Sequence, residues 1–186
     1  MTRREPRAVV ISPFANERVR QWPARNYREL IGLIWREHGF AAMIVGTRGQ
    51  RAVANGLVRG LSSEWATNAC GVLSWRELTE AVDAAPYVVA NNSGVAHLAA
   101  ARGCWTLCLF SGSHAYNEWM PRGPLVVTVG RVLPCSPCAL GGDRCINHVA
   151  CMAELQPSEV FWRFNHARNS VLATECDADI RPGEAR

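Results

Sequence analysis

Three loops with residues suited to anion binding each follow a short apolar run of the sequence. The first loop, residues 12–23, carries Asn16 and Arg20 and ends in Trp22-Pro23. Arginine holds a phosphate or carboxylate through a planar fork of N–H donors. All 20 basic residues are Arg, so an anion site here must use guanidinium or backbone N–H groups. The alternative for this loop is a solvated segment that Trp22 anchors to the core.

The second loop runs from Asn91 to His97 and leads from an apolar run into an alanine-rich stretch. Its Gly94 allows a ligand to approach the backbone closely, and a helix that starts there offers unpaired N–H groups to a phosphate. The spacing fits neither a P-loop nor a dinucleotide-binding fingerprint. Such a turn is also common as plain structure, and a histidine in its first helical turn more often packs than catalyses. The third loop, Gly46 to Gln50, is by itself a simple turn.

Four of the eight cysteines fall in one segment with the pattern Cys-x2-Cys-x6-Cys-x5-Cys. They are Cys135, Cys138, Cys145 and Cys151. The x2 pair is a metal-ligand spacing, and four thiolates can close a tetrahedral site around zinc or iron, with His148 as a further candidate ligand. Without an export signal, a disulfide framework is less expected than a metal site or free thiols. Cys104 and Cys108 are expected on a strand, packed in the core.

Short apolar runs alternate with helical patterns along most of the chain. Strands are expected at residues 8–12, 40–45, 87–90, 105–110 and 125–129. Helices are expected at residues 26–38, 50–61, 75–85, 95–102 and 158–167, with Asn26 as one N-cap and Ser74-Trp75-Arg76-Glu77 as a capping box. This alternation predicts an α/β fold with a doubly wound parallel sheet. Ligands bind such sheets outside the carboxyl ends of the strands, where the three loops would meet.

Length and composition restrict the class of protein. The 186 residues suit one globular domain, and a net charge of +4 without basic clusters gives no support for nucleic-acid binding. No apolar run approaches the roughly 18 residues of a membrane span. The polar residues 1–6 do not resemble an export signal, so we expect a cytoplasmic protein.

The loops together resemble glycosyltransferase family 9, which comprises the ADP-heptose:lipopolysaccharide heptosyltransferases and their relatives. The matching stretches are Arg20-Gln21-Trp22-Pro23, Gly46–Gln50 and Asn91–Ala100. The resemblance runs from about residue 8 to residue 167 and covers only the C-terminal, donor-binding half of the family. It implies a single Rossmann-like domain of the two-domain GT-B type, here with a cysteine-rich insertion, and a nucleotide diphosphate sugar as ligand.

The resemblance also implies a donor-binding set. Its members are Asn16, Arg20, Gln50, Asn92, Ser93, Gly94, Val95 and His97. Arg20 stands where the family usually has a lysine against the donor phosphates, and Ser93 to Val95 stand where the diphosphate is held. Gln50 replaces an acid that often meets the ribose, and Asn92 replaces an aspartate of many members, which puts donor choice or activity in doubt. No catalytic residue is assigned.

We expect residues 1–168 to form the nucleotide-sugar-binding domain, with the cysteine-rich segment at 135–151, and the mixed, polar residues 169–186 to form a tail. A chain of 186 residues has no room for the acceptor domain, so transfer to a glycan, lipopolysaccharide or protein would need an acceptor-domain partner or a missing N-terminal half. A homo-oligomer is the other expected assembly. Transfer itself requires no cofactor.

Two alternatives remain open at this point. One is a non-catalytic nucleotide-sugar-binding module, and the other is a metal-stapled interaction domain. The four-cysteine segment is similar to the iron-binding motif of the autotransporter heptosyltransferases, although its spacing does not match that motif closely.

Overall fold

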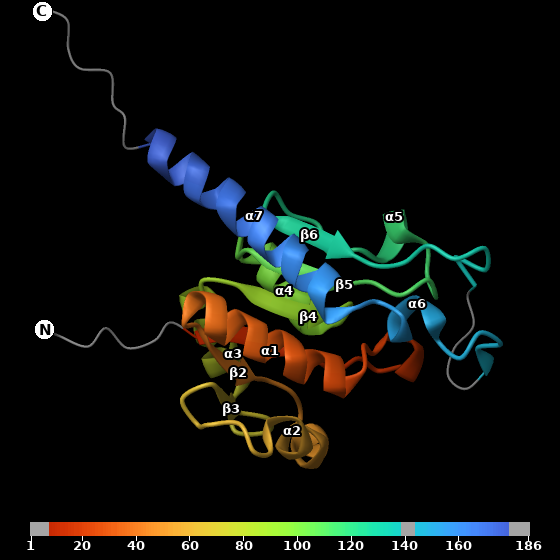
Figure 1. Ribbon diagram of the computed structural model, residues 1–186, viewed down its shortest axis with the longest axis horizontal. Coiled ribbons are helices and arrows are strands. Elements are labelled where there is room, and N and C mark those ends of the chain that lie inside the picture. The colour runs from red at the N-terminus through yellow and green to blue at the C-terminus, as the bar shows by residue number, and fades with distance from the viewer. Residues whose placement is uncertain (1–7, 139–143, 179–186) are drawn as a thin grey trace, which may run out of the picture.

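The computed structural model describes residues 8–138 and 144–178, which form one six-stranded parallel sheet with helices on both faces (Figure 1). The strands are β1 (Ala8–Ser12), β2 (Ala41–Ile44), β3 (Ala66–Asn68), β4 (Val88–Asn91), β5 (Thr106–Leu109) and β6 (Val126–Val129). Their order in the sheet is β3-β2-β1-β4-β5-β6, and every neighbouring pair is parallel. The predicted doubly wound α/β fold is therefore confirmed.

The described chain has seven α-helices and two 3-10 turns, of which α6 and α7 follow the last strand. The helices are α1 (Ala24–His38), α2 (Arg51–Val58), α3 (Trp75–Ala84), α4 (Gly94–Ala101), α5 (Tyr116–Trp119), α6 (Ala150–Ala153) and α7 (Pro157–Ala178). The 3-10 turns are η1 (Arg18–Arg20) and η2 (Arg48–Gln50).

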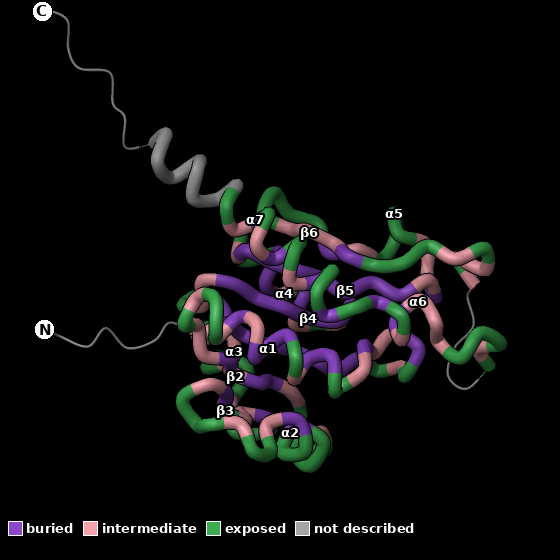
Figure 2. The backbone as a smooth tube through the Cα atoms, in the orientation of Figure 1, coloured by how far each residue is buried: buried purple, intermediate pink, exposed green. Residues whose placement is uncertain are grey.

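Alternate residues of the central strands enter two separate cores. Val9 and Ile11 of β1 pack with α1, α2 and α7, whereas Val10 packs with α3 and α4 on the other face. Successive side chains of a strand point to opposite faces, so a sheet covered on both sides needs strands that are apolar throughout. Figure 2 shows the buried residues running continuously along the central strands.

The strand order reverses its direction between β1 and β4. The chain moves from β1 outward to β2 and β3, then returns to β4 on the other side of β1 and continues outward to β5 and β6. The loops after β1 and β4 therefore leave the sheet in opposite directions and open a crevice at the carboxyl ends of these two strands. This crevice is the place where the fold favours a ligand.

Several helix boundaries follow from local sequence signals. Gly39 ends α1 in the left-handed conformation (φ 66°), as expected from its place just after the apolar pattern. The Ser74 capping box at the start of α3 is confirmed. The expectation that Asn26 caps α1 was wrong: α1 begins at Ala24, and the buried Asn26 side chain donates to the carbonyl of Leu155 instead.

Three further expectations need correction. Helix α7 continues to Ala178, so the first ten residues of the segment expected to be a polar tail, 169–186, are helical; residues 179–186 lie outside the described chain. Cys108 is fully buried on β5 as expected, whereas Cys104 precedes that strand and is only half-buried, although it packs against the same core as Cys108. Strand β3 was not predicted at all.

In the part of the chain that the structure describes, every helix is too short or too polar to cross a membrane.

Candidate functional site

A cavity of about 380 Å³ lies at the carboxyl ends of the strands, where the three anion-suited loops converge. Its walls come from the loops after β1, β2, β3 and β4 and from the start of α3. The lining residues are Ser12, Phe14, Ala15, Asn16, Val45, Gly46, Thr47, Arg48, Gln50, Ala69, Gly71, Leu73, Ser74, Trp75, Leu78, Ser93, Gly94 and Val95. A cavity of this size is in the range that holds small-molecule ligands.

The start of α4 provides the polar end of the cavity. Ser93 precedes the helix, but its hydroxyl does not cap it, and the Oγ atom is buried without a hydrogen-bond partner. The first N–H groups of a helix have no partner inside the helix, and the helix dipole makes them attractive to an anion. A Cβ atom placed on Gly94 would meet no described atom within 4 Å, so the packing of the protein does not require glycine there. Space is therefore open beside Gly94 at the start of α4, where the first N–H groups have no partner inside the helix.

Arg20 and Glu17 lie in the loop after β1 and form an incomplete ion pair. Arg20 Nη2 is 3.7 Å from Glu17 Oε1, which is beyond hydrogen-bond distance. Arg20 Nε and Glu17 Oε2 are both buried without a hydrogen-bond partner. Buried polar atoms are nearly always hydrogen-bonded in folded proteins, so unsatisfied atoms call for an explanation such as an absent ligand.

Asn91, at the end of β4, fastens the loop after β1 to the sheet. This side chain is completely buried, and its Oδ1 accepts from the backbone N–H of Trp22 (3.1 Å) and from the hydroxyl of Tyr27 (2.9 Å). Its Nδ2 donates to the carbonyl of Pro13 at 2.6 Å. Burial, and secondarily the charge of Cys108, raise the pKa of Tyr27 well above the usual value, so this hydroxyl stays a donor. Sequence reasoning missed Asn91; an amide that ends an otherwise apolar strand was the available signal.

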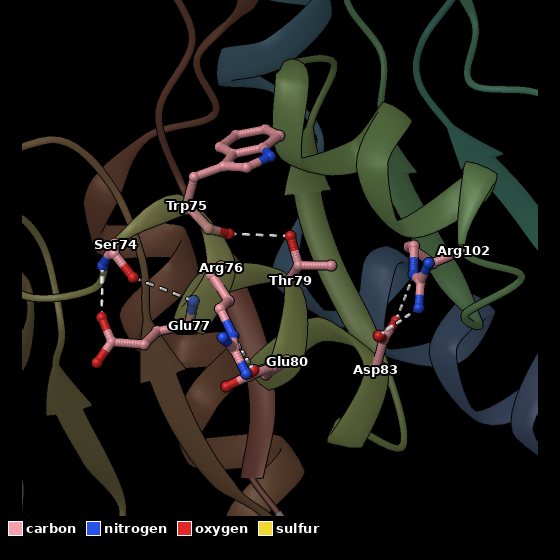
Figure 3. Close-up of polar contacts among 8 residues, drawn as sticks. All are labelled: Ser74, Trp75, Arg76, Glu77, Thr79, Glu80, Asp83 and Arg102. Carbon is pink, nitrogen blue, oxygen red and sulfur yellow. Dashed lines mark hydrogen bonds and ion pairs between the residues drawn. The ribbon is translucent and has the colours of Figure 1, made fainter.

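The start of α3 provides the apolar end of the cavity. Ser74 Oγ accepts from the backbone N–H of Glu77 (3.3 Å), and Glu77 Oε2 accepts from the backbone N–H of Ser74 (2.7 Å), which fixes the first turn (Figure 3). Trp75 follows directly, with 69% of its surface exposed although it lines the cavity. Leu73 and Leu78 line the cavity beside it. A large exposed indole at a cavity mouth can cover a flat aromatic ligand group.

The loop after β2 is held by its own capping interaction. Gln50 Oε1 accepts from the backbone N–H of Thr47 at 2.8 Å, so this side chain is partly committed to the η2 turn. Gly71 lies beside this loop in the left-handed conformation (φ +68°), and a Cβ there would be 2.5 Å from Arg48 Cα. Glycine at position 71 is thus required by the protein itself, in contrast to Gly94.

The structure brings five of the eight expected donor-site residues to the cavity wall. These are Asn16, Gln50, Ser93, Gly94 and Val95. The other three do not line it. The exposed His97 bonds through Nε2 to Oδ1 of the buried Asn92 (3.2 Å), and Arg20 pairs with Glu17.

The four clustered cysteines lie near one another as free thiols. Burial raises the pKa of the Cys151 thiol, and the neighbouring sulfurs of the other three raise it further. Cys145 Sγ accepts from the backbone N–H of Val149 (3.2 Å), and Cys135 Sγ accepts from Asn147 Nδ2 (3.3 Å). Among the described residues, no three His, Cys, Asp or Glu side chains are arranged to hold a metal ion.

A sequence model described as glycosyltransferase family 9 (heptosyltransferase) matches residues 3–147. The chain belongs to glycosyltransferase family 9. No curated protein matches it. Its fold is similar to that of E. coli ADP-heptose LPS heptosyltransferase II, with a TM-score of 0.75 and 19% identity over 88% of this chain and 46% of that chain.

Two further solved structures share the fold of this family 9 chain. E. coli heptosyltransferase WaaC with ADP has a TM-score of 0.69 and 16% identity, over 90% of this chain and 46% of that chain. The iron-containing dodecameric glycosyltransferase TibC from enterotoxigenic E. coli has a TM-score of 0.69 and 15% identity, over 92% of this chain and 47% of that chain. The chain therefore spans less than half the length of these proteins.

Proposed function

We propose that this chain is the donor-binding half of a nucleotide-sugar-dependent glycosyltransferase, and that its ligand is a nucleoside diphosphate sugar of the ADP-heptose kind. One observation carries the proposal. The described chain has four buried side-chain atoms without hydrogen-bond partners, and three of them, Glu17 Oε2, Arg20 Nε and Ser93 Oγ, lie in the two loops that border the strand-order reversal. A ligand bound at this crevice would supply the missing partners.

A diphosphate is the group that suits the two unsatisfied donors. Arg20 Nε and Ser93 Oγ can both donate to phosphate oxygens, and the free N–H groups at the start of α4 add further donors. In the proposed transfer, an acceptor hydroxyl oxygen bonds to the anomeric carbon. The bond from that carbon to the diphosphate oxygen breaks, and the diphosphate leaves with the electron pair. Donors aimed at the departing diphosphate would stabilise the charge that develops on it.

The opposite end of the cavity suits the nucleobase. Trp75, Leu73 and Leu78 offer an apolar surface, while the Ser74 capping box holds the start of α3 in place. A flat base stacked on the indole would leave its diphosphate extending toward α4. This division of the cavity into an apolar end at α3 and a polar end at α4 supports a nucleotide as the ligand.

The acceptor side of the reaction is proposed to come from outside these residues. The chain covers 46% of the length of heptosyltransferase II, and no residue described here is assigned as the base that takes the acceptor proton. We therefore expect the acceptor glycan, lipopolysaccharide or protein to be presented by a partner domain, or by another copy of the chain. TibC, which shares the fold, is described as dodecameric.

A zinc or iron ion on Cys135, Cys138, Cys145 and Cys151 is proposed as a structural staple. The N–H donors on the Cys135 and Cys145 sulfurs would support thiolate ligands, and TibC is described as iron-containing. The arrangement of the thiols does not yet fit a metal, so the sulfurs would have to move together on binding. No step of the transfer depends on this ion.

Calorimetric titration of the purified chain with ADP, UDP and GDP tests the proposed function. We expect saturable binding of one diphosphate, weakened in Arg20→Ala by about 1–3 kcal/mol, the scale for losing charge-assisted hydrogen bonds. Arg36→Ala is the matched control because Arg36 is exposed near the far end of α1. Failure of all three nucleotides to bind would reject the proposal. Equal affinity of wild type and Arg20→Ala would remove Arg20 from the site.

A further inference from the structure

Glu17 places a carboxylate beside the guanidinium that is proposed to hold the diphosphate. Its side chain is 38% exposed, whereas the Arg20 side chain is 16% exposed, and the two approach to 3.7 Å. Glu17 directly precedes η1 and Arg20 ends it, so the backbone keeps both groups at this edge of the sheet. Any anion that reaches the Arg20 guanidinium must therefore also come close to the negative charge of the Glu17 carboxylate.

The unsatisfied atoms of this pair ask for two different kinds of partner. Arg20 Nε is a donor and needs an acceptor, while Glu17 Oε2 is an acceptor and needs a donor. The oxygens of a diphosphate at neutral pH are mainly acceptors, so the diphosphate group of a bare nucleoside diphosphate can satisfy Arg20 but offers Glu17 no donor. A nucleotide sugar brings sugar hydroxyls next to its diphosphate, and these can donate to the carboxylate.

The two ligands also differ in charge. A terminal phosphate has a second ionisation near pH 6, by analogy with phosphate monoesters, which is absent when the same phosphate is esterified by a sugar. The free diphosphate therefore carries roughly one more negative charge near Arg20 at neutral pH. Glu17 repels this extra charge on the free diphosphate. The same carboxylate repels the nucleotide sugar less, because the sugar-esterified phosphate lacks that charge.

We propose that Glu17 is a specificity-determining residue that makes the site prefer a nucleotide sugar over the nucleoside diphosphate left after transfer. This inference rests on the proposed function. The carboxylate would favour the nucleotide sugar in two ways. It accepts a hydrogen bond from a sugar hydroxyl, and it repels the terminal phosphate of the free diphosphate. The preference would also speed the release of the diphosphate product.

Calorimetric titration with ADP and with ADP-heptose tests the inference in wild type, Glu17→Gln and Glu17→Ala. Both substitutions should tighten ADP binding by about fivefold, the order expected for removing one like charge at a partly exposed site. Glu17→Ala should also weaken ADP-heptose binding. The dissociation constant for ADP divided by that for ADP-heptose should therefore fall by about tenfold in this variant. Glu29→Gln is the control, because Glu29 is exposed on α1.

The outcomes separate the two proposals. If wild type binds ADP through Arg20 but neither Glu17 variant changes the ratio of dissociation constants, the role of Glu17 is rejected and the donor site stands. If the ratio also falls in Glu29→Gln, the effect is one of overall charge, and the inference is likewise rejected. If wild type binds neither nucleotide, the donor site itself fails. Thermal unfolding of each variant verifies that the fold is retained.

Discussion

The backbone N–H of Trp22 donates to Oδ1 of Asn91 at 3.1 Å, so the residue that ends β4 holds the turn that follows β1. The indole of Trp22 donates in turn to the carbonyl of Leu155, which ties the same turn to the segment before α7. Through these bonds the loop that carries Arg20 is fixed at its base to the strand that leads into Ser93. The two sides of the crevice are thus built as one unit.

Asn91→Ala should destabilise the fold because it leaves the Trp22 N–H, the Tyr27 hydroxyl and the Pro13 carbonyl without their buried partner. We expect a loss of about 3 kcal/mol or more in the free energy of unfolding, measured by urea denaturation. Asn117→Ala, at an exposed position on α5, should be close to neutral. A loss under about 1 kcal/mol for Asn91→Ala would contradict the role of this node.

Gly94→Val and Gly71→Ala should separate a ligand-related glycine from a structural one. A Cβ atom at position 94 would meet no described atom within 4 Å, so Gly94→Val should leave unfolding nearly unchanged and weaken ADP binding by about tenfold or more. Gly71→Ala forces a left-handed residue against Arg48 and should cost about 1–3 kcal/mol or more in stability. Paired calorimetry and denaturation measure both effects. A Gly94→Val protein that unfolds as readily as Gly71→Ala would show that the turn before α4 is only structural.

The Ser74 capping box should make the stability of α3 depend on pH. Hydrogen bonds from the Ser74 side chain, and next from its backbone, hold the pKa of Glu77 below its usual value. A lowered carboxyl pKa stabilises the fold above the pKa of the unfolded chain, and this contribution is lost as the pH falls through the folded pKa. In Ser74→Ala the pKa of Glu77 should rise toward about 4.3, as measured by NMR titration.

The stability difference between wild type and Ser74→Ala should accordingly shrink below about pH 4. Asp83 is the internal control, since its pKa is lowered by hydrogen bonds from Arg102 at the other end of α3 and should not respond to Ser74 (Figure 3). An unchanged Glu77 pKa in Ser74→Ala would show that the box does not form in solution.

Metal analysis tests the proposed staple. The chain purified with zinc or iron supplied should hold one ion, and Cys135→Ser or Cys151→Ser should lose it. Cys104 lies outside the cluster, and its thiol donates to the Val82 carbonyl. Cys104→Ser should therefore retain the ion. Metal-free wild type under both supplements would reject the staple.

The sequence was sufficient to predict the parallel sheet because each central strand is a short apolar run, buried on both faces. Strand β3 escaped prediction because Ala66–Asn68 has three residues, of which only Ala66 is buried. The cavity loops were found from their arginine and glycine residues. The Asn91 node was not, because its partners lie 64 to 78 residues away in the chain and no local pattern records such contacts. Likewise, the Glu17 pairing depends on side-chain packing at η1.

The most direct test of the donor site is an NMR titration of the isotope-labelled chain with ADP. We expect saturable shifts at the amides of Gly94, Val95 and Ala96 and at the Arg20 Nε signal, with the same dissociation constant for all four. Shifts concentrated instead at another cavity, of about 260 Å³ and lined by His114 and Arg131, or no shifts at all, would contradict the donor site.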